Sequence, residues 1–349
     1  MNYSDLYLSD LRKASDSVPN PEKLRGKRVF VTGAGGLIGS ALVDLLSQAN
    51  LECKIYAGGR NLSRLEKRFT QSGDVSCLRY DALEPFRCPE AFDLIIHAAS
   101  PATPKSYSAN PVETMLANLE GVRNLLEYVR LRPGARLCYI SSSEVYGLRN
   151  SAEPYAEGDY GYLNILNPRA CYPSAKRASE TLCAAYLDEY GADSVIVRPG
   201  HVYGPTMTDA DERAASQFLR AAVAGEPIVM KSDGAQLRSY TYVVDAASAI
   251  LTVALHGQSG EAYNISNPDS IVTVRAFAER AALAGQCEIR FETPSERERR
   301  SYNLMSNSSL NSGKLEALGW RGRFDLREGV EHSVAILKEN AAEKARFAQ

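Results

Sequence analysis

The chain has little charge imbalance and no long apolar run, and each absence excludes a class of protein. Its 349 residues carry a formal net charge of −2 at pH 7, whereas a protein whose main partner is nucleic acid or an anionic membrane usually has an excess of Lys and Arg. No stretch approaches the length of a transmembrane helix without charges, and the first ten residues carry acids where a secretory signal needs an apolar run. We therefore expect a cytoplasmic protein that binds neither nucleic acid nor membrane.

Histidine is scarce, and the cysteines do not form pairs. The four His (positions 97, 201, 256 and 332) show no metal-ligand spacing, and the seven Cys include no Cys-x2-Cys pair. An odd number of Cys also argues against a disulfide framework. Cys171 has no evident base partner, so we interpret it as a packing residue rather than a nucleophile. The sequence therefore predicts no metal site.

Strand-like and helix-like segments alternate along the first 200 residues. The strand candidates are 28–32, 54–57, 93–98, 136–142 and 194–198. Between them, apolar residues recur at helical spacing from Val112 to Leu126 and again after Lys176. This alternation is typical of a doubly wound parallel sheet with right-handed crossovers. We predict an α/β Rossmann-type fold with a smaller C-terminal substrate-binding lobe.

Three parts are expected along the chain. Residues 1–25 precede the first strand and are predicted to form an arm or an extra helix. Residues 26–200 are predicted to form the dinucleotide-binding domain. Beyond Pro199 the pattern breaks into shorter pieces, as expected for a lobe over the carboxyl ends of the strands. Residues 201–349 are therefore predicted to be mainly substrate-binding, with the chain able to cross between the lobes.

A glycine-rich turn follows the first strand candidate. The segment Val29-Phe-Val-Thr-Gly33-Ala-Gly35-Gly36-Leu37-Ile38-Gly39-Ser40 combines an apolar strand, a turn and the start of an amphipathic helix. Glycines let such a turn close and let its backbone approach a pyrophosphate that lies on the helix N-terminus. A lone glycine fingerprint is a weak signal, but this one precedes two further motifs in the expected order.

The most informative of these motifs is Tyr172-Pro-Ser-Ala-Lys176, downstream of Ser141-Ser-Ser-Glu144. A phenol has a pKa near ~10, so it is a poor base at neutral pH unless its anion is stabilised. Lys176, four residues on, shares a helix face with Tyr172 and can supply the stabilising charge. Pro173 suits a first helical turn, which places Tyr172 at a helix N-terminus. Such a site removes a proton from an alcohol while hydride leaves its carbon; the alternative is an amphipathic helix with one buried Tyr and one solvated Lys.

Together the two motifs resemble an extended short-chain dehydrogenase/reductase of the NAD-dependent epimerase/dehydratase family acting on a nucleotide sugar. Within it, the chain is most similar to the UDP-glucuronate decarboxylase branch. The resemblance covers most of residues 27–332. The segments that carry it include His97-Ala-Ala-Ser-Pro-Ala, Asn110-Pro-Val, Ser141-Ser-Ser-Glu-Val-Tyr-Gly, Asn167-Pro-Arg-Ala-Cys-Tyr172 and Arg238-Ser-Tyr-x-Tyr-Val-x-Asp245.

The resemblance implies a nicotinamide cofactor and a set of residues that bind it. These are Gly33, Gly35, Gly36, Leu37, Ile38, Gly39, Arg60, Asn61, Asp81, Ala98, Ala99, Ser100, Asn118, Tyr172 and Lys176. For Asp81 and Asn118, a helix-cap or turn role is an equal alternative.

The choice between NAD and NADP depends on the end of the second strand. NAD enzymes of this fold usually place an acid there to bind the ribose 2′-hydroxyl. Ile55-Tyr-Ala-Gly-Gly-Arg60-Asn61 offers no carboxylate, and Arg60 suits the 2′-phosphate of NADP. Most relatives of the branch use NAD, and a surface Arg is a common alternative. We expect NAD(P), with a slight preference for NADP.

The Ser-Glu pair points to the reaction class. In the family, Ser142 would bind the oxidised sugar oxygen, and Ser143 and Glu144 would lie near the substrate. Related 4,6-dehydratases have Asp-Glu where this chain has Ser143-Glu144, and 4-epimerases generally lack the Glu. The pair matches the decarboxylases, in which C4 oxidation makes the sugar a β-keto acid that loses carbon dioxide. The alternative for Glu144 is a structural carboxylate.

Two departures from the branch are visible. Where the branch has Arg-x-Phe-Asn, this chain has Arg198-Pro-Gly-His201, so His201 replaces an Asn that contacts substrate, or else it only packs. The Arg that usually precedes the last Leu-Gly-Trp is absent, although Arg299 and Arg300 stand slightly upstream. Arg213 and Arg238 match family positions that grip the diphosphate, for which a guanidinium fork is well suited.

Decarboxylation is therefore the leading prediction, ahead of dehydration, epimerisation and net reduction. A cofactor-binding sensor without turnover is the alternative outside the enzymes, and such sensors commonly lack the Tyr/Lys pair that this chain retains. The helices expected over 112–129 and 172–190 resemble those that pair across a two-fold axis in the family, so a homodimer is expected.

Overall fold

A seven-stranded parallel sheet is the centre of the molecule in the computed structural model, which describes residues 3–48, 52–70, 74–296 and 305–347. Its strand order is β10-β6-β5-β4-β1-β2-β3, and every neighbouring pair is parallel. The strands are β1 (Arg28–Thr32), β2 (Lys54–Gly59), β3 (Val75–Arg79), β4 (Leu94–His97), β5 (Arg136–Ile140), β6 (Ser194–Pro199) and β10 (Ala262–Ile265). The predicted doubly wound α/β fold is confirmed.

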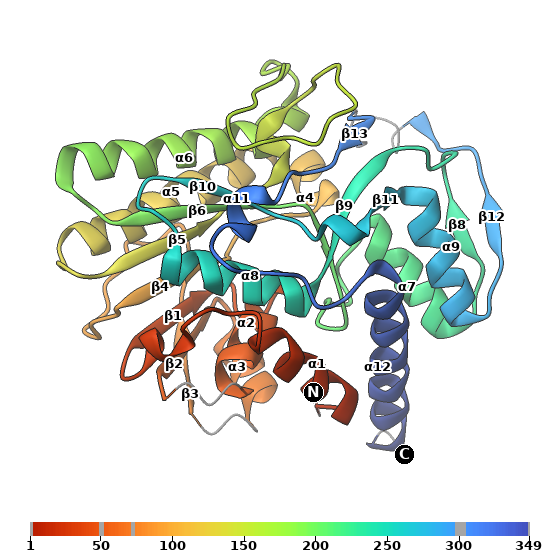
Figure 1. Ribbon diagram of the computed structural model, residues 1–349, viewed down its shortest axis with the longest axis horizontal. Coiled ribbons are helices and arrows are strands. Elements are labelled where there is room, and N and C mark those ends of the chain that lie inside the picture. Colours follow the sequence, from red (N-terminus) through yellow and green to blue (C-terminus); the bar gives the residue numbers. More distant parts are fainter. Residues whose placement is uncertain (1–2, 49–51, 71–73, 297–304, 348–349) are drawn as a thin grey trace.

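Helices cover both faces of this sheet, as Figure 1 shows. On one side lie α5 (Pro111–Arg130) and α6 (Cys171–Tyr190), which pack against each other. On the other lie α2 (Leu37–Gln48) and α8 (Val243–His256). Because both faces are covered, the central strands β1 and β4 are almost wholly buried, which explains their continuous apolar sequence.

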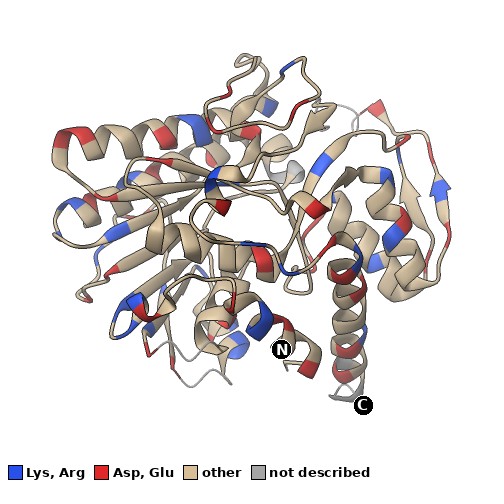
Figure 2. Cartoon of the chain, in the orientation of Figure 1, with Lys and Arg blue, Asp and Glu red and all other residues tan. Residues whose placement is uncertain are grey.

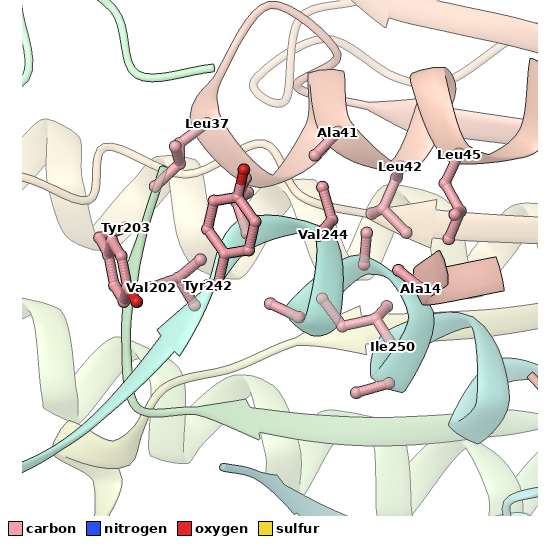
Figure 3. Close-up of a cluster of buried hydrophobic side chains, with 14 of the residues drawn as sticks. Ala14, Leu37, Ala41, Leu42, Leu45, Val202, Tyr203, Tyr242, Val244 and Ile250 are labelled. Atoms are coloured by element: carbon pink, nitrogen blue, oxygen red, sulfur yellow. The ribbon is translucent and has the colours of Figure 1, made fainter. Parts of the chain in front are cut away.

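The core between α2 and α8 is built from closely fitting aliphatic side chains. Ala41, Leu42 and Leu45 of α2 face Val244 and Ile250 of α8 (Figure 3). All five are fully buried, and full burial of one such Val, Leu or Ile side chain contributes roughly 1.5–3 kcal/mol. This packing holds the first turn of α2, and with it the glycine-rich turn, against the sheet.

A smaller lobe lies beside the carboxyl ends of the strands. It contains one sheet of β7 (His201–Tyr203), β9 (Leu237–Tyr242), β11 (Ile271–Thr273) and β13 (Asn307–Ser308), and a second sheet of β8 (Ile228–Met230) and β12 (Ile289–Phe291). Its longer helices are α7 (Ala214–Ala224), α9 (Val274–Gly285) and α12 (Leu326–Phe347). Although α8 and β10 come after residue 201, they belong to the large sheet and its helical cover.

The remaining elements are short. They are α3 (Leu62–Phe69), α4 (Pro104–Ala109), α11 (Gly313–Glu316) and the 3-10 turns η1 (Pro21–Leu24), η2 (Ser143–Tyr146), η3 (Pro168–Ala170) and η4 (Pro268–Ser270). Acidic and basic positions are distributed over both lobes (Figure 2). Within the described residues, no helix is long and apolar enough to cross a membrane.

Residues before the first strand form a helix that contacts both lobes. This helix, α1 (Asp5–Ser15), is capped at its N-terminus by Ser4, whose hydroxyl accepts a hydrogen bond from the Tyr7 amide at 3.2 Å. The Tyr7 hydroxyl donates to Asp44 of α2 at 2.9 Å. Asp10 accepts from the hydroxyl of Tyr242 at 2.8 Å and contacts His332 of α12 at 3.0 Å. The N-terminal segment thus connects the large sheet layer to the smaller lobe.

Candidate active site

The glycine-rich turn between β1 and α2 has no room for side chains at two positions. Gly33 has φ +65°, and a Cβ there would lie 2.7 Å from the carbonyl carbon of Ala98. A Cβ on Gly39 would overlap the carbonyl oxygen of Gly33. The turn therefore lies directly against the end of β4 and against its own helix, with the first amides of α2 free of helical carbonyl partners. Such a helix N-terminus suits a pyrophosphate, so the residues present fit a dinucleotide.

Three of the predicted cofactor-binding residues, Arg60, Asn61 and Asp81, lie just after the ends of β2 and β3. Arg60 is exposed where β2 ends. The side chain of Asn61 caps α3, accepting from the amide of Arg64 at 2.9 Å. Asp81 follows β3, and its carboxylate accepts from the amide of Leu83 at 3.1 Å. Asn61 and Asp81 therefore have structural roles in the turns that they occupy, and their roles toward a cofactor stay predictions.

Asn118 links the end of β4 to α6. Its Oδ1 accepts a hydrogen bond from Ser100 at 2.8 Å, and its backbone carbonyl accepts from Ser179 of α6 at 3.3 Å. Next to Ser100, the amide of Ala99 donates to Thr32 at 3.2 Å. The predicted segment Ala98–Ser100 is thereby tied both to β1 and, through Asn118, to the helix that carries the Tyr and Lys.

Tyr172 and Lys176 lie on the first turns of α6, which begins at Cys171 as the proline spacing predicts. Both side chains are buried. Lys176 Nζ donates to the carbonyl of Ile140, at the end of β5, at 2.7 Å and lies 5.7 Å from the centre of the Tyr172 ring. The ring of Tyr172 stacks on that of Tyr107, 4.6 Å away. Tyr172 and Lys176 are therefore held between the carboxyl end of β5 and α4.

The stabilisation of a Tyr172 phenolate by Lys176 stays a prediction, and the burial of both groups acts against it. Burial, and after it the negative charge of Glu144, raise the pKa of Tyr172 to about 12, against the lowering effect of the nearby Ser142 hydroxyl. Burial also lowers the pKa of Lys176 to about 7, and Glu180 acts in the opposite direction. Desolvation disfavours the charged form of each group, so burial opposes the stabilisation that the shared helix face allows.

Ser142, Ser143 and Glu144 leave the end of β5 in a tight turn that points toward Tyr172. Ser142 precedes η2, and its hydroxyl accepts from the Glu144 amide at 3.2 Å. Glu144 forms a two-bond ion pair with Arg169, at 2.8 and 3.0 Å. The structure thus brings together the predicted Ser, Glu, Tyr and Lys, and it adds a guanidinium that was not assigned a role.

The smaller lobe contributes His201, Arg213 and Arg238. Arg213 is held by Asp211 in an ion pair of 2.6 Å. Arg238 is buried and donates to the Leu237 carbonyl at 2.8 Å. Burial, with the positive charges of Arg238 and Arg213, lowers the pKa of His201 to about 3, so its imidazole is neutral. Its Nδ1 is buried without a hydrogen-bond partner among the described residues, and its role toward a substrate stays a prediction.

Three further residues of the site were missed by sequence reasoning. Arg169 lies three residues before Tyr172 in a segment that carries the resemblance, yet no role was given to it. Glu180 is one helical turn beyond Lys176, a spacing that could have identified it. It accepts from Arg198 at 2.6 Å and from Ser141 at 2.5 Å. Tyr107 gave no signal, because only the fold stacks it on Tyr172.

Arg299 and Arg300 lie outside the described residues. Among the residues that the structure does describe, no three His, Cys, Asp or Glu side chains gather in a way that could hold a metal ion.

Known proteins resemble this chain in sequence and in fold. A family model described as the NAD dependent epimerase/dehydratase family matches residues 29–266. UDP-glucuronic acid decarboxylase 6 of Arabidopsis thaliana is 33% identical over 324 residues, covering 89% of this chain and 91% of that protein. UDP-glucuronic acid decarboxylase 1 of Xenopus tropicalis is 30% identical over 325 residues, covering 91% of this chain and 74% of that protein.

Two solved structures have the same fold. One is a dTDP-glucose 4,6-dehydratase from Streptomyces venezuelae with NAD and TYD bound, with a TM-score of 0.78 at 23% identity over 90% of this chain and 98% of that one. The other is a UDP-glucose 4-epimerase from Thermotoga maritima with UDP-glucose, with a TM-score of 0.77 at 21% identity over 90% of this chain and 99% of that one. At these identities, the likeness shows the fold alone.

Proposed function

The chain belongs to the NAD-dependent epimerase/dehydratase family, and within it we propose that the protein removes carbon dioxide from a nucleotide sugar with a C6 carboxylate, as UDP-glucuronate decarboxylases do. The observation that carries the proposal is Glu144 in an Arg-lined site beside Tyr172, with Ser143 where a dehydratase has an Asp. The decarboxylases of Arabidopsis thaliana and Xenopus tropicalis, at 33% and 30% identity, support it.

The chemistry follows from the positions of the hydroxyl groups. The Ser142 hydroxyl lies near enough to Tyr172 to influence its pKa, so a sugar hydroxyl placed between them would lose its proton to Tyr172 and be held by Ser142. NAD, when bound over the glycine-rich turn, would supply the reversible hydride acceptor for C4. Once C4 is a ketone, the sugar is a β-keto acid. Its C5–C6 bond can break, with the electron pair drawn into the C4 carbonyl and carbon dioxide released.

Ser142 and the buried Lys176 would then stabilise the C4 oxygen, which gains negative charge in that step. Ser142 can donate a hydrogen bond to this oxygen, and the Lys176 charge lies near the Tyr172 ring at 5.7 Å. In a buried site, such preorganised donors stabilise developing charge more than water does. Protonation at C5 then converts the enolate to a 4-ketone, and return of hydride to C4 with the proton from Tyr172 to its oxygen would complete the decarboxylated sugar.

Glu144→Gln tests this assignment, because it keeps the size of the side chain and removes the charge. If the later steps need Glu144, the variant should still oxidise C4 in a single turnover, building up reduced-nicotinamide absorbance, while carbon dioxide release slows sharply. Normal product formation by Glu144→Gln would contradict both the decarboxylase and dehydratase assignments and leave an epimerase or reductase.

We also propose a slight preference for NADP over NAD, because Arg60 suits the 2′-phosphate of NADP. The solved dehydratase named above contains NAD, and the comparisons give NADP no support. Arg60 is nevertheless exposed at the end of β2, and Arg60-Asn61 brings no carboxylate to the ribose. Identifying the nucleotide released from denatured protein, and measuring NAD and NADP affinity in Arg60→Ala, tests the preference for NADP. Release of NAD alone, with both affinities unchanged in Arg60→Ala, would refute it.

We also propose that the protein is a homodimer that pairs through α5 and α6. Val112 and Leu116 on α5 are 63% and 46% exposed, and both come from the first two turns of the helix. Exposed apolar residues grouped on one helix face commonly mark an interface.

A further inference from the structure

Arg169 is the closest cation to Glu144 and is only partly buried. Its guanidinium bonds to both carboxylate oxygens, and the two side chains remain 16% and 20% exposed, respectively. The Nε of Arg169 is buried and has no hydrogen-bond partner within the part of the chain that the structure describes. The guanidinium therefore has a donor beyond those that Glu144 uses.

The position of Arg169 is fixed relative to the proton-transfer group. Its guanidinium lies over the Tyr107 ring at 5.0 Å, and Tyr107 stacks on Tyr172 at 4.6 Å with an angle of 16° between the planes. Both Arg169 and Glu144 are near enough to influence the pKa of Tyr172, in opposite directions. A substrate whose C4 oxygen contacts Tyr172 would therefore bring its C6 group close to this ion pair.

The two site arginines from the smaller lobe are placed differently. Arg213 is held by the Asp211 carboxylate through Nε and Nη2, at 2.9 and 2.6 Å. Arg238 is held by the backbone of its own strand. Arg169 is thus the cation whose partner, Glu144, is itself a site residue that a ligand can approach.

A sugar with a C6 carboxylate would meet a like charge at Glu144. Repulsion between two carboxylates in a partly buried site is strong unless a cation lies between them. A planar guanidinium can bind two carboxylates at once through different edges. A neutral hydroxymethyl group at C6 would need no such neutralisation.

We infer that Arg169 binds the C6 carboxylate of the substrate while it stays paired with Glu144, and so selects nucleotide sugar acids over neutral nucleotide sugars. This inference rests on the proposed decarboxylase function. It places the carboxylate-binding guanidinium on η3, in a chain that lacks the usual Arg before the last Leu-Gly-Trp.

Binding measurements with UDP-glucuronate, UDP-glucose and UDP test the inference. Calorimetry on Arg169→Met should show affinity for UDP-glucuronate lowered by roughly ten- to a hundredfold, the usual effect of removing a charge-assisted pair. Affinities for UDP-glucose and UDP should change less than threefold. Arg169→Lys, which keeps the charge without the fork, should recover part of the loss. Arg275→Met is the matched control, because Arg275 is an exposed arginine on α9 that pairs with Glu279.

The outcomes separate this inference from the proposed function. If wild-type protein binds UDP-glucuronate no better than UDP-glucose, both are overturned. If wild type prefers UDP-glucuronate and Arg169→Met keeps the full preference in a stably folded protein, only the inference is overturned. A merely positioning role for Arg169 would lower kcat and leave the ratio of the two affinities unchanged.

Discussion

Replacing Tyr172 by Phe separates chemistry from folding, because the change removes one oxygen and keeps the ring. The ring of Tyr172 is buried and stacks on Tyr107 at 4.6 Å, contacts that Phe can reproduce. The hydroxyl lies near Ser142, and even a hydrogen bond between the two would contribute only about 1 kcal/mol to stability. A general base contributes roughly 10²–10⁴ in rate, which corresponds to about 3–5 kcal/mol of activation free energy.

We therefore expect Tyr172→Phe to fold, to bind cofactor normally and to lose roughly two to four orders of magnitude in the rate of C4 oxidation. The assay is single-turnover absorbance of reduced nicotinamide, with thermal melting to check the fold. Tyr128→Phe is the matched control: the Tyr128 hydroxyl donates to the Glu90 carbonyl at 2.6 Å and accepts from the Phe92 amide at 2.9 Å, away from the site. It should lose stability and keep its rate. A Tyr172→Phe rate within tenfold of wild type would refute the role of Tyr172 as base.

Three further outcomes are expected. Gly39→Ala should weaken binding of NAD and cost about 1–3 kcal/mol of stability, because a Cβ would overlap the Gly33 carbonyl; Gly158→Ala, where nothing lies within 4 Å, should change neither in the same titration and melt. The hydrogen bond to Asp10 raises the pKa of His332, so the protonated His332 stabilises the folded protein by about 1 kcal/mol after discounting for exposure. This stabilisation is complete below the unfolded pKa of about 6.5 and is lost as pH rises through the folded pKa. The difference in melting temperature between wild type and His332→Gln should therefore shrink from pH 5.5 to pH 8.5, and a constant difference would contradict the linkage. Light scattering should give a dimer mass for wild type and a monomer mass for Leu116→Asp, whereas a wild-type monomer would exclude the proposed interface.

Much of the large sheet could be predicted, because buried parallel strands have a distinctive sequence. The predicted strand at 28–32 coincides with β1, and the predicted helix start near Tyr172 agrees with α6. The strand β3 was missed because Val75–Arg79 is only half buried and lacks a continuous apolar run. The strand β10 was missed because it follows the smaller-lobe segments in the sequence but joins the large sheet.

The electrostatics of the site could not be read from spacing. A four-residue interval places Tyr172 and Lys176 on one face, but the pKa of each depends on how deeply the fold encloses it. The pair Glu144–Arg169 spans 25 residues of sequence and forms only because η2 and η3 meet in three dimensions. Sequence motifs therefore picked out residues that the fold brings together, while their protonation and partners depend on tertiary packing.

Analysis of the product made from UDP-glucuronate by wild-type protein tests the decarboxylase proposal most directly. Purified protein, supplied with NAD and in parallel with NADP, would be incubated with UDP-glucuronate, and the product mass and trapped carbon dioxide would be measured together. The proposal predicts a nucleotide sugar that has lost its carboxyl group, with one carbon dioxide per product and no lasting accumulation of reduced cofactor. An isomer of unchanged mass, or recovery of UDP-glucuronate beside turnover of a neutral nucleotide sugar, would contradict it.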